Sequence, residues 1–517
     1  MNTANFLSIP ASMFPEQEIV VSGDRRFTYA DLLSRVRRLS SALRERGVER
    51  GTKVGVLATN SHRYLECFYA TASAGGTFVP LNYRAKLDEL EYMIGRAAPR
   101  VLFVADRYAP LLDELEGRLP AGMARIALDG ESRGDREYED LLASGREDVE
   151  DVDIEEEDTC ILMYTSGTTS LPKGVMLTFG DFTSYVVGTV EMADGSPRGA
   201  SVLCVPLYHI AGATSIMTSL WAGRRVIVLS QFDSAEWLRA VAEEHATHAF
   251  LVPTMLKKIL DHSEFASTDL TSLENLSYGG APMPFPVIRR AVESFPSSCG
   301  FVNAFGQTET TSTLTVLGPE DHRFSGDPAA DEERLRRLRS IGKPLPDVEV
   351  KVVGEDGAEL GPNETGEILV RTPRVMKGYA GDVQGGAKLE ADGFLHTRDL
   401  GYVDSDGYVF LVGRKDDMII RGGENIAPAE VESVLQTHPS VDEVAVLGLP
   451  NEEWGQVVAA AVVLKPGASA SPEELAEHCR ARLASFKKPE VIHLLDELPR
   501  NPLGKVLRNE LRARLVG

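Results

Sequence analysis

A loop between two apolar segments carries the residues whose chemistry is clearest. The apolar run ILMY (161–164) leads into TSGTTSLPKG (165–174), and a second strand-like segment follows. Small residues allow backbone N–H groups to close around an anion, hydroxyl groups add donors, and a lysine adds a positive charge. The loop therefore predicts a phosphate-binding site formed by Thr165, Ser166, Gly167, Thr168, Thr169 and Lys173.

The spacing of this loop differs from that of a Walker A motif, which requires G-x-x-x-x-G-K-[ST] followed by a helix. Here five residues separate Gly167 from Lys173, Gly174 follows the lysine, and the next segment has the pattern of a strand. A flexible polar hairpin is the alternative that composition allows. The strands expected on both sides favour the phosphate site.

Six further motifs follow in order along the chain: PLYH (206–209), YGGAP (278–282), FGQTET (305–310), TRDLG (397–401), GRKDDMIIRGGENIAPAEVE (413–432) and PRNPLGK (499–505). Together with YTSGTTSLPKG, they resemble the motifs of the adenylate-forming superfamily. That superfamily includes acyl-CoA synthetases for fatty and aryl acids, peptide-synthetase adenylation domains and firefly luciferase. The resemblance runs from about residue 160 to the end, and the first 150 residues fit the family's N-terminal subdomain.

The resemblance implies a reaction in which a carboxylate attacks the α-phosphorus of ATP and releases pyrophosphate. Two anions must meet, so positive charge and Mg²⁺ are expected. Thr308 would hydrogen-bond a phosphate oxygen. Glu309 would bind Mg²⁺, because a hard cation prefers oxygen ligands.

The same resemblance implies an adenosine site. Gly279, Gly280, Ala281 and Pro282 would shape a slot for adenine, Phe305 would cover one face of the ring, and Gly306 would belong to the same ATP site. Asp399 would accept hydrogen bonds from the ribose hydroxyls, with assistance from Arg414. Family members usually carry glycine where Arg398 stands, which leaves the backbone conformation at this position open.

Lys505 is the residue that the resemblance assigns to the chemical step. Proline and glycine in PRNPLGK predict a turn that presents the lysine, although a lone lysine in a turn is usually only a surface residue. Its ammonium group would bridge the attacking carboxylate and the α-phosphate. In the second step the acyl group would pass to coenzyme A, because Gly422, Gly423 and Trp454 resemble residues that line a pantetheine tunnel. Asp416 matches the hinge about which the C-terminal domain rotates between the two steps.

The acyl pocket is the part of the site that the motifs describe least. His209 resembles a position at the pocket mouth, where it would gate access or contact the carboxylate. The candidates for the pocket wall are Tyr208, Ile210, Ala211, Gly212, Met255, Gly280, Ala304 and Thr311. None of these side chains is charged, and only a protonated His209 would add charge. We therefore expect a neutral, apolar tail from a medium-chain, alicyclic or aryl acid.

The segments that must position these residues alternate between helix and strand over the first part of the chain. Apolar periodicity predicts helices over 27–45, 86–97 and 236–245, and strands over 54–58, 101–105, 201–207 and 247–253. This alternation predicts an α/β fold with largely parallel sheets. After residue 345, short strands with Gly/Asp turns predict antiparallel, β-barrel-like sheet, and from Asp416 a compact α+β unit follows. The predicted domains are a large N-terminal adenylation domain (1–415) with layered α/β sheets and a small mobile C-terminal domain (416–517).

Composition restricts the partners and the compartment. Among 517 residues, 54 Lys+Arg face 77 Asp+Glu, and the net charge of -23 argues against nucleic acid as a partner. No apolar run approaches the roughly 20 residues of a membrane helix, and neither end carries a targeting signal, so a cytoplasmic location is expected. Five scattered cysteines predict buried, reduced thiols. The expected partners are a small carboxylic acid, ATP and CoA; a homodimer is compatible with the sequence, which does not decide the oligomeric state.

Three other functions remain open. An adenylation enzyme could load the phosphopantetheine arm of a carrier protein, and free acyl-CoA formed with CoA alone would exclude that acceptor. A luciferase-like oxidase would consume molecular oxygen. A non-catalytic nucleotide-binding protein is a third alternative, but the joint presence of Lys505, Glu309 and Asp399 argues against it, since a binding module would not require the lysine.

Overall fold

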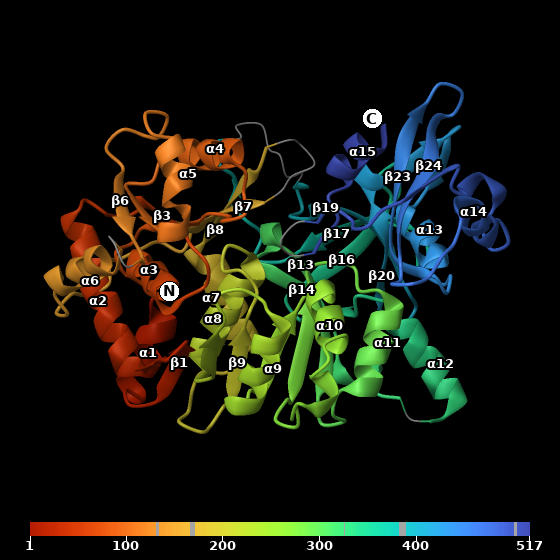
Figure 1. Ribbon diagram of the computed structural model, residues 1–517. Helices are drawn as coiled ribbons and strands as arrows, with labels where there is room; N and C mark the ends of the chain where they lie inside the picture. Colours follow the sequence, from red (N-terminus) through yellow and green to blue (C-terminus); the bar gives the residue numbers. More distant parts are fainter. Residues whose placement is uncertain (131–133, 166–170, 325, 382–388, 501–503, 517) are drawn as a thin grey trace. The chain divides into compact units, whose positions relative to one another are not determined.

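The computed structural model describes residues 1–130, 134–165, 171–324, 326–381, 389–500 and 504–516. Two compact units are present, one formed by 1–334 with 372–388 and the other by 335–371 with 389–517 (Figure 1). The predicted boundary at 415/416 does not coincide with this division. It remains a prediction about which part of the chain moves.

The first unit contains two sheets, each mainly parallel with antiparallel strands toward its edges. In spatial order, one sheet contains β2 (Arg25–Thr28), β1 (Glu18–Ser22), β10 (Arg225–Val228), β9 (Ala200–Leu203), β11 (His248–Leu251), β12 (Asn275–Gly279), β13 (Gly300–Gln307) and β14 (Ser312–Leu317). The other contains β6 (Ala124–Ala127), β5 (Val101–Val104), β3 (Lys53–Leu57), β4 (Thr77–Pro80), β7 (Thr159–Thr165), β8 (Lys173–Thr178) and β18 (Gly378–Tyr379). This arrangement confirms the predicted layered α/β fold.

Helices cover the faces of these sheets. They are α1 (Asn5–Met13), α2 (Tyr29–Glu45), α3 (His62–Ser73), α4 (Leu87–Ala97), α5 (Ala109–Glu114), α6 (Gly134–Ser144), α7 (Phe179–Thr189), α8 (Ile210–Ala222), α9 (Ser234–Glu243), α10 (Pro253–Leu260) and α11 (Phe285–Ser294). Helix α12 (Pro328–Arg337) spans the division between the two units. Helix α3 contacts β1 of one sheet and β4 of the other, while α7 contacts β8 and packs on α8, which contacts β9 and β10 (Figure 1). A layer of helices therefore lies between the two sheets.

Two element boundaries differ from the sequence prediction for identifiable reasons. Helix α2 begins at Tyr29, two residues later than predicted, because Thr28 and Asp31 form a reciprocal capping box. Strand β9 ends at Leu203, although the apolar run continues to Leu207. Beyond the strand, the side chain of Asn60 donates to the carbonyl of Val205 (3.0 Å) and accepts from the N–H of Leu207 (3.0 Å), so a side chain replaces the neighbouring strand.

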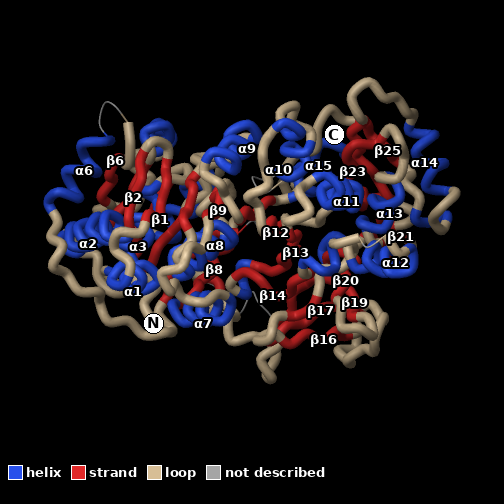
Figure 2. The backbone as a smooth tube through the Cα atoms, turned by 90° about the horizontal axis from the view of Figure 1, so that it is seen from below, coloured by secondary structure: helices blue, strands red, loops and turns tan. Residues whose placement is uncertain are grey.

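The second unit contains two further sheets and the last three helices. Figure 2 shows the four antiparallel strands grouped together: β16 (Glu349–Val353), β17 (Gly366–Arg371), β19 (Leu395–Val403) and β20 (Val409–Arg414). The other sheet consists of β22 (Glu424–Ile426), β21 (Ile419–Arg421), β24 (Gly455–Leu464), β23 (Val441–Asn451) and β25 (Val491–Leu494). The helices are α13 (Pro428–Leu435), α14 (Pro472–Arg480) and α15 (Arg508–Val516). A short strand, β15 (Lys343–Pro344), also belongs to this unit.

The β23–β24 hairpin has a core on each face. Residues such as Val446 and Val458 pack with α13 and α14 on one face, and Leu447 and Ala459 pack with Leu511 of α15 on the other. All five cysteines are buried and unpaired, as the sequence predicts. Among the described residues, no helix has the length and hydropathy needed to cross a membrane.

Candidate functional site

The two ends of the predicted phosphate loop lie side by side in the first unit. Thr165 at the end of β7 is paired with Lys173 at the start of β8. The ammonium of Lys173 lies 5.1 Å from the centre of the Tyr379 ring. Four loop residues predicted from sequence lie outside the described residues: Ser166, Gly167, Thr168 and Thr169. The antiparallel strands flanking the loop confirm the predicted strand–loop–strand arrangement.

Thr308 and Glu309 lie together in a single helical turn, Thr308–Thr310, at the end of β13. The Glu309 carboxylate accepts a hydrogen bond from the Tyr379 hydroxyl at its Oε1 atom (2.8 Å). The Glu309 carbonyl accepts from the N–H of Met376 (2.8 Å). The turn is therefore held by a segment that lies about 70 residues later in the sequence.

The donor set fits Mg²⁺ in the form in which enzymes usually bind it with nucleotides. No group of three or more His, Cys, Asp or Glu side chains gathers among the described residues, so an all-protein cage is not formed there. Mg²⁺ commonly uses one or two carboxylates and completes its shell with water and phosphate oxygens. Glu309 supplies such a carboxylate, and among the described residues its Oε2 atom accepts no hydrogen bond.

The predicted adenine-binding residues meet at the carboxyl ends of two neighbouring strands. Gly279 of β12 is paired in parallel with Ala304 of β13, so Gly280 and Phe305 follow at the same edge. A Cβ atom on Gly279 would lie 2.1 Å from the carbonyl oxygen of Ala304, and only glycine avoids this clash. Ligands of open α/β sheets bind at this edge. Ala281 and Pro282 follow the end of β12, whereas Gly306 lies near the end of β13.

The predicted ribose residues form a cross-strand pair in the second unit. Asp399 of β19 is paired with Arg414 of β20, and Arg414 Nε donates to Asp399 Oδ1 (2.9 Å). The neighbouring Arg398 adopts a left-handed φ of 63°, which explains why glycine is usual at this position. Both carboxylate oxygens of Asp416, the predicted hinge residue, accept hydrogen bonds from Arg398.

Lys505 lies close to the same pair. Burial lowers the pKa of Lys505, the nearby Arg414 guanidinium lowers it further, and the carboxylates of Asp417 and Asp399 oppose this shift. Arg500 and Val506 form an antiparallel backbone bridge, and residues 501–503 of the predicted turn lie outside the described residues. In the second unit, the predicted catalytic lysine therefore lies within electrostatic range of the predicted ribose residues.

The residues predicted to contact CoA form a separate cluster in the second unit. The N–H of Gly422 donates to the carbonyl of Trp454 (2.8 Å), and a Cβ atom on Gly422 would lie 2.9 Å from the indole ring. Trp454 is 43% exposed, and the Arg421 guanidinium lies 5.3 Å from its ring centre. Gly423 follows, also with a positive φ. An exposed aromatic face beside a close glycine backbone is the arrangement predicted for a thiol arm.

His209 occupies the N-cap position of α8, and its side chain makes no capping hydrogen bond. Burial lowers the pKa of His209 to about 3, and the nearby Arg84 guanidinium contributes. Of the residues considered for the acyl wall, the one that could carry charge is therefore uncharged near neutral pH. His209 Nε2 and the hydroxyl of the buried Tyr208 have no hydrogen-bond partner among the described residues. Such orphaned polar atoms are rare in folded proteins, and a ligand or a water would satisfy them.

The other predicted wall residues are distributed around α8 and β13. Ala211 and Gly212 belong to the first turn of α8, and a Cβ atom on Gly212 would lie 2.6 Å from the carbonyl oxygen of Pro206. Ala304 lies on β13. Thr311 is fully buried, and its hydroxyl donates to the carbonyl of Arg374 (3.1 Å). The Thr311 side chain therefore stabilises the turn that carries Glu309.

Sequence reasoning did not identify Tyr379 or Arg374, which contact the predicted site residues directly. Both lie in a short segment, 372–381, that shares no recognised motif with the phosphate loop or with FGQTET. These two residues reach the site because strand β18 pairs with β8, which lies about 200 residues earlier in the sequence. No local pattern of residues signals such a long-range contact.

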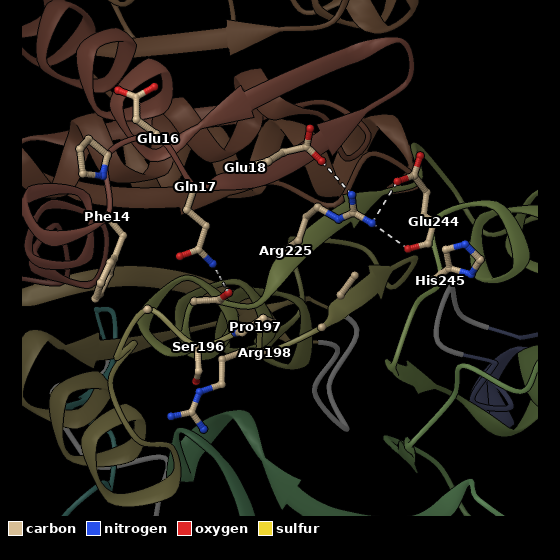
Figure 3. Close-up of a pocket in the computed structure, with 15 residues that line it drawn as sticks. Phe14, Glu16, Gln17, Glu18, Ser196, Pro197, Arg198, Arg225, Glu244 and His245 are labelled. Atoms are coloured by element: carbon tan, nitrogen blue, oxygen red, sulfur yellow. Dashed lines mark hydrogen bonds and ion pairs between the residues drawn. The ribbon is translucent and has the colours of Figure 1, made fainter.

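A cavity of about 660 Å³ lies elsewhere in the first unit, at the amino ends of β1, β9 and β10 (Figure 3). Several of its polar side chains pair with one another or with the backbone: Arg225 contacts Glu18 (2.8 Å) and Glu244 (3.1 Å), and Gln17 donates to the Gly223 carbonyl. None of its lining residues is a predicted site residue. Because α/β sheets bind ligands at the carboxyl edge, we assign this cavity no part in the reaction.

The predicted phosphate and adenine residues Thr165, Gly280 and Phe305 lie at or near the carboxyl ends of β7, β12 and β13, the edge at which open α/β sheets bind nucleotides and other ligands. Residues 8–380 match the family model described as AMP-binding enzyme, and residues 430–505 match the model of the AMP-binding enzyme C-terminal domain. The chain therefore belongs to the AMP-binding enzyme family, as the sequence motifs indicate.

Individual relatives cover nearly the whole chain. A feruloyl-CoA synthase from an Amycolatopsis species is 37% identical over 98% of this chain and 97% of its own length. A fatty acid–[acyl-carrier-protein] ligase, ScoC, from Streptomyces coeruleorubidus is 32% identical over 99% of this chain and 96% of its own. The crystal structure of the o-succinylbenzoate CoA synthetase MenE from Bacillus subtilis, in complex with its acyl-adenylate intermediate, superposes with a TM-score of 0.84 at 30% identity, covering 98% of each chain.

Proposed function

We propose that the chain is an AMP-forming carboxylic acid–CoA ligase. ATP and an acid give an acyl-adenylate and pyrophosphate, and CoA then gives acyl-CoA and AMP. The observation that carries the proposal is the hydrogen-bonded pair of Asp399 and Arg414 in the second unit, with which the Lys505 ammonium interacts electrostatically. A positive group beside a ribose-binding pair is what attack on the α-phosphate of a nucleotide requires.

In the first step, a carboxylate oxygen of the acid forms a bond to the α-phosphorus, and the bond from that phosphorus to the bridging oxygen of pyrophosphate breaks. Lys505 would offset the negative charge that develops when two anions meet. Lys173, Thr165 and Thr308 would hold the phosphates. Glu309 would hold Mg²⁺, which supplies further positive charge to the phosphate oxygens when bound.

In the second step, the CoA thiolate attacks the acyl carbon and AMP leaves. Gly422, Gly423 and Trp454 would line the path of the pantetheine arm as a second face of this unit, since the Gly422 backbone lies against the exposed indole ring of Trp454. Rotation of residues 416–517 about Asp416 would exchange the two faces. This proposal retains the domain boundary expected from the sequence, together with a cytoplasmic location.

An apolar acid with an aryl group is the favoured substrate class. The acyl wall would be uncharged, because burial keeps His209 neutral, and small residues such as Ala211 and Ala304 leave space. The similarity to a feruloyl-CoA synthase and to an o-succinylbenzoate CoA synthetase supports an aryl tail. Medium-chain and alicyclic acids remain within the same apolar class.

Transfer to a carrier protein is the second candidate function. It is favoured by the similarity to a fatty acid–[acyl-carrier-protein] ligase over nearly the whole chain. Both functions share the adenylation step and differ only in the thiol acceptor.

Pyrophosphate release across a panel of carboxylic acids, with and without CoA, tests the proposal. The panel should include ferulate, indoleacetate, benzoate, cyclohexanecarboxylate and octanoate. We expect acid-dependent pyrophosphate release with an aryl acid, and free acyl-CoA in the presence of CoA. Release that continues only with a phosphopantetheinylated carrier protein would favour the second candidate, and no release with any acid would reject both.

A further inference from the structure

Residues 374–380 link the two predicted phosphate-handling elements of the first unit. Strand β18 pairs antiparallel with β8, with Tyr379 opposite Val175. The N–H of Ala380 donates to the carbonyl of Gly174 (2.7 Å), next to Lys173. At its other end, Met376 donates to the carbonyl of Glu309. One short segment is thus bonded to both the base of the phosphate loop and the turn that carries the carboxylate.

Tyr379 contacts Glu309 through its hydroxyl group and Lys173 through its aromatic ring. Its hydroxyl donates to Glu309 Oε1 (2.8 Å), and its ring faces the ammonium of Lys173 at 5.1 Å from the ring centre. A hydrogen bond to an ionised carboxylate is directional and relatively strong. A cation over an aromatic ring is also attracted, although more weakly at exposed sites.

This placement keeps the two opposite charges apart. Lys173 and Glu309 form no ion pair with each other, and both are described residues. A direct pair would cancel much of the charge that each group offers to a ligand. With Tyr379 between them, Lys173 remains available to an anion, and Glu309 Oε2 remains available to a cation.

The buried Arg374 stabilises the turn that carries Glu309 by hydrogen bonds from its side chain to backbone carbonyls. Its side chain is fully buried, and its Nη1 atom donates to the carbonyls of Thr310 (3.2 Å), Thr311 (3.4 Å) and Thr313 (3.1 Å). Thr311 and Ser312 both adopt positive φ values, of 49° and 81°. Non-glycine residues hold this strained conformation only when their surroundings enforce it. The turn therefore presents Glu309 to Tyr379 in a fixed position.

We propose that Tyr379 is a positioning residue that orients Glu309 for metal binding and holds Lys173 at a fixed separation from it before the nucleotide arrives. The proposal rests on the proposed adenylation function for its chemical meaning. The Tyr379 hydroxyl fixes the orientation of the Glu309 carboxylate, and the Tyr379 ring fixes the position of the Lys173 ammonium. Removing the hydroxyl should weaken metal binding while leaving the ring contact in place.

The test compares Tyr379→Phe with the matched control Tyr138→Phe. Tyr138 also donates to a carboxylate, at Glu66 Oε2 (2.6 Å), but it lies between α6 and α3, away from the predicted site. Binding of Mn²⁺ to the full-length protein, with the α,β-methylene analogue of ATP, is measured by electron paramagnetic resonance. We expect about tenfold weaker Mn²⁺ binding in Tyr379→Phe, the effect of one lost hydrogen bond to a charged group, and no change in Tyr138→Phe.

A kinetic readout separates positioning from damage to the fold. The Mg²⁺ concentration that half-saturates acid-dependent pyrophosphate release should rise by the same factor in Tyr379→Phe, while the rate at saturating Mg²⁺ recovers to within about threefold of the unsubstituted protein. Conversion of supplied acyl-adenylate and CoA should be unchanged. A Tyr379→Leu variant, which also loses the ring, should in addition bind the nucleotide analogue more weakly.

Unchanged Mn²⁺ affinity in Tyr379→Phe would overturn the inference, as would an equal loss in Tyr138→Phe. If the unsubstituted protein binds no Mn²⁺ with the nucleotide, the inference also fails. Absence of acid-dependent pyrophosphate release in the unsubstituted protein would instead reject the proposed function. The Mn²⁺ measurement would still decide the role of Tyr379 in that case.

Discussion

The paired side chains Asp399 and Arg414 illustrate how single residues define the candidate site. Only 5% of the Asp399 residue surface is exposed, and Arg414 holds one of its carboxylate oxygens at 2.9 Å. A buried carboxylate with a fixed orientation is a selective acceptor for neighbouring hydroxyl groups. Its function is therefore best tested by changing the ribose as well as the protein.

We predict that Asp399→Asn removes the preference for ATP over 2′-deoxy-ATP. If Asp399 accepts from the ribose 2′-hydroxyl, the unsubstituted protein should use ATP about tenfold or more efficiently than the deoxynucleotide, because one hydrogen bond to a charged group is lost. In Asp399→Asn both nucleotides should have similar kcat/KM values. The measurement is pyrophosphate release at several nucleotide concentrations. An undiminished preference in the variant would exclude ribose recognition by this residue.

At the same scale, motifs predicted several residue clusters but not every contact. Gly422 and Trp454 were expected to share a face, and they do, because the hairpin between β23 and β24 returns beside β21. Gly280 and Phe305 were expected together, and each directly follows one member of the cross-strand pair Gly279–Ala304 of β12 and β13. Tyr379 and Arg374 could not be predicted, because their contacts arise from a chain return that no local pattern encodes.

At the scale of elements, apolar periodicity located helices and strands well where tertiary contacts agree with it. Strand β5 (Val101–Val104) matches the predicted strand over 101–105 to within one residue. Apolar periodicity misplaced an element boundary where side chains take over backbone hydrogen bonds. Asn60 does so after β9, and the Thr28–Asp31 box does so before α2. Asn60 lies 145 residues before Val205, so no local pattern encodes that contact. The Thr28–Asp31 box is local, and its spacing is a helix-start signal that apolar periodicity alone does not include.

The ion pair between Arg398 and Asp416 connects strand β19 to the turn Lys415–Asp417 that follows β20. We predict that Arg398→Gly changes the free energy of unfolding by less than about 1 kcal/mol. Glycine relieves the strain of the positive φ at residue 398, which stabilises the folded state. Two effects oppose this gain: the loss of the largely exposed Arg398–Asp416 ion pair, and the greater conformational freedom of glycine in the unfolded chain. Thioester formation from supplied acyl-adenylate should become faster, up to about fivefold, because the pair restrains the proposed hinge.

The matched control for this variant is Arg371→Ala, which removes another two-pronged pair, with Glu349, in the sheet formed by β16 and β17. That change should not affect thioester formation. A rate increase in both variants, or a slower thioester step in Arg398→Gly, would contradict the proposed restraint. Urea unfolding and single-turnover kinetics supply the two measurements.

At the scale of the whole molecule, buried histidines link stability to pH. Burial lowers the pKa of His62 and His209 to about 3 and of His248 and His322 to about 4. In the unfolded chain these groups titrate near 6.5. As pH falls below 6.5, the unfolded state therefore binds protons that the folded state does not, and folding is disfavoured.

We predict that the free energy of unfolding falls as pH is lowered from about 7 to about 5. Each neutral buried histidine contributes up to about 1.4 kcal/mol per pH unit. Asp181 opposes the effect, because burial raises its pKa to about 6 and its folded form gains a proton first. Urea unfolding at the two pH values measures the slope. His322→Gln should reduce it and His245→Asn, at an exposed position, should not; a flat profile would contradict the assignment.

The central claim is that Lys505 acts in adenylate formation and not in thiol transfer. The most direct test measures both half-reactions of Lys505→Ala: acid-dependent exchange of pyrophosphate into ATP, and conversion of supplied acyl-adenylate and CoA to acyl-CoA. We predict that exchange falls by about a hundredfold or more, because a preorganised charge facing the transition state is lost, while thioester formation stays within about threefold. An equal loss in both half-reactions with the fold intact, or undiminished exchange, would contradict the account.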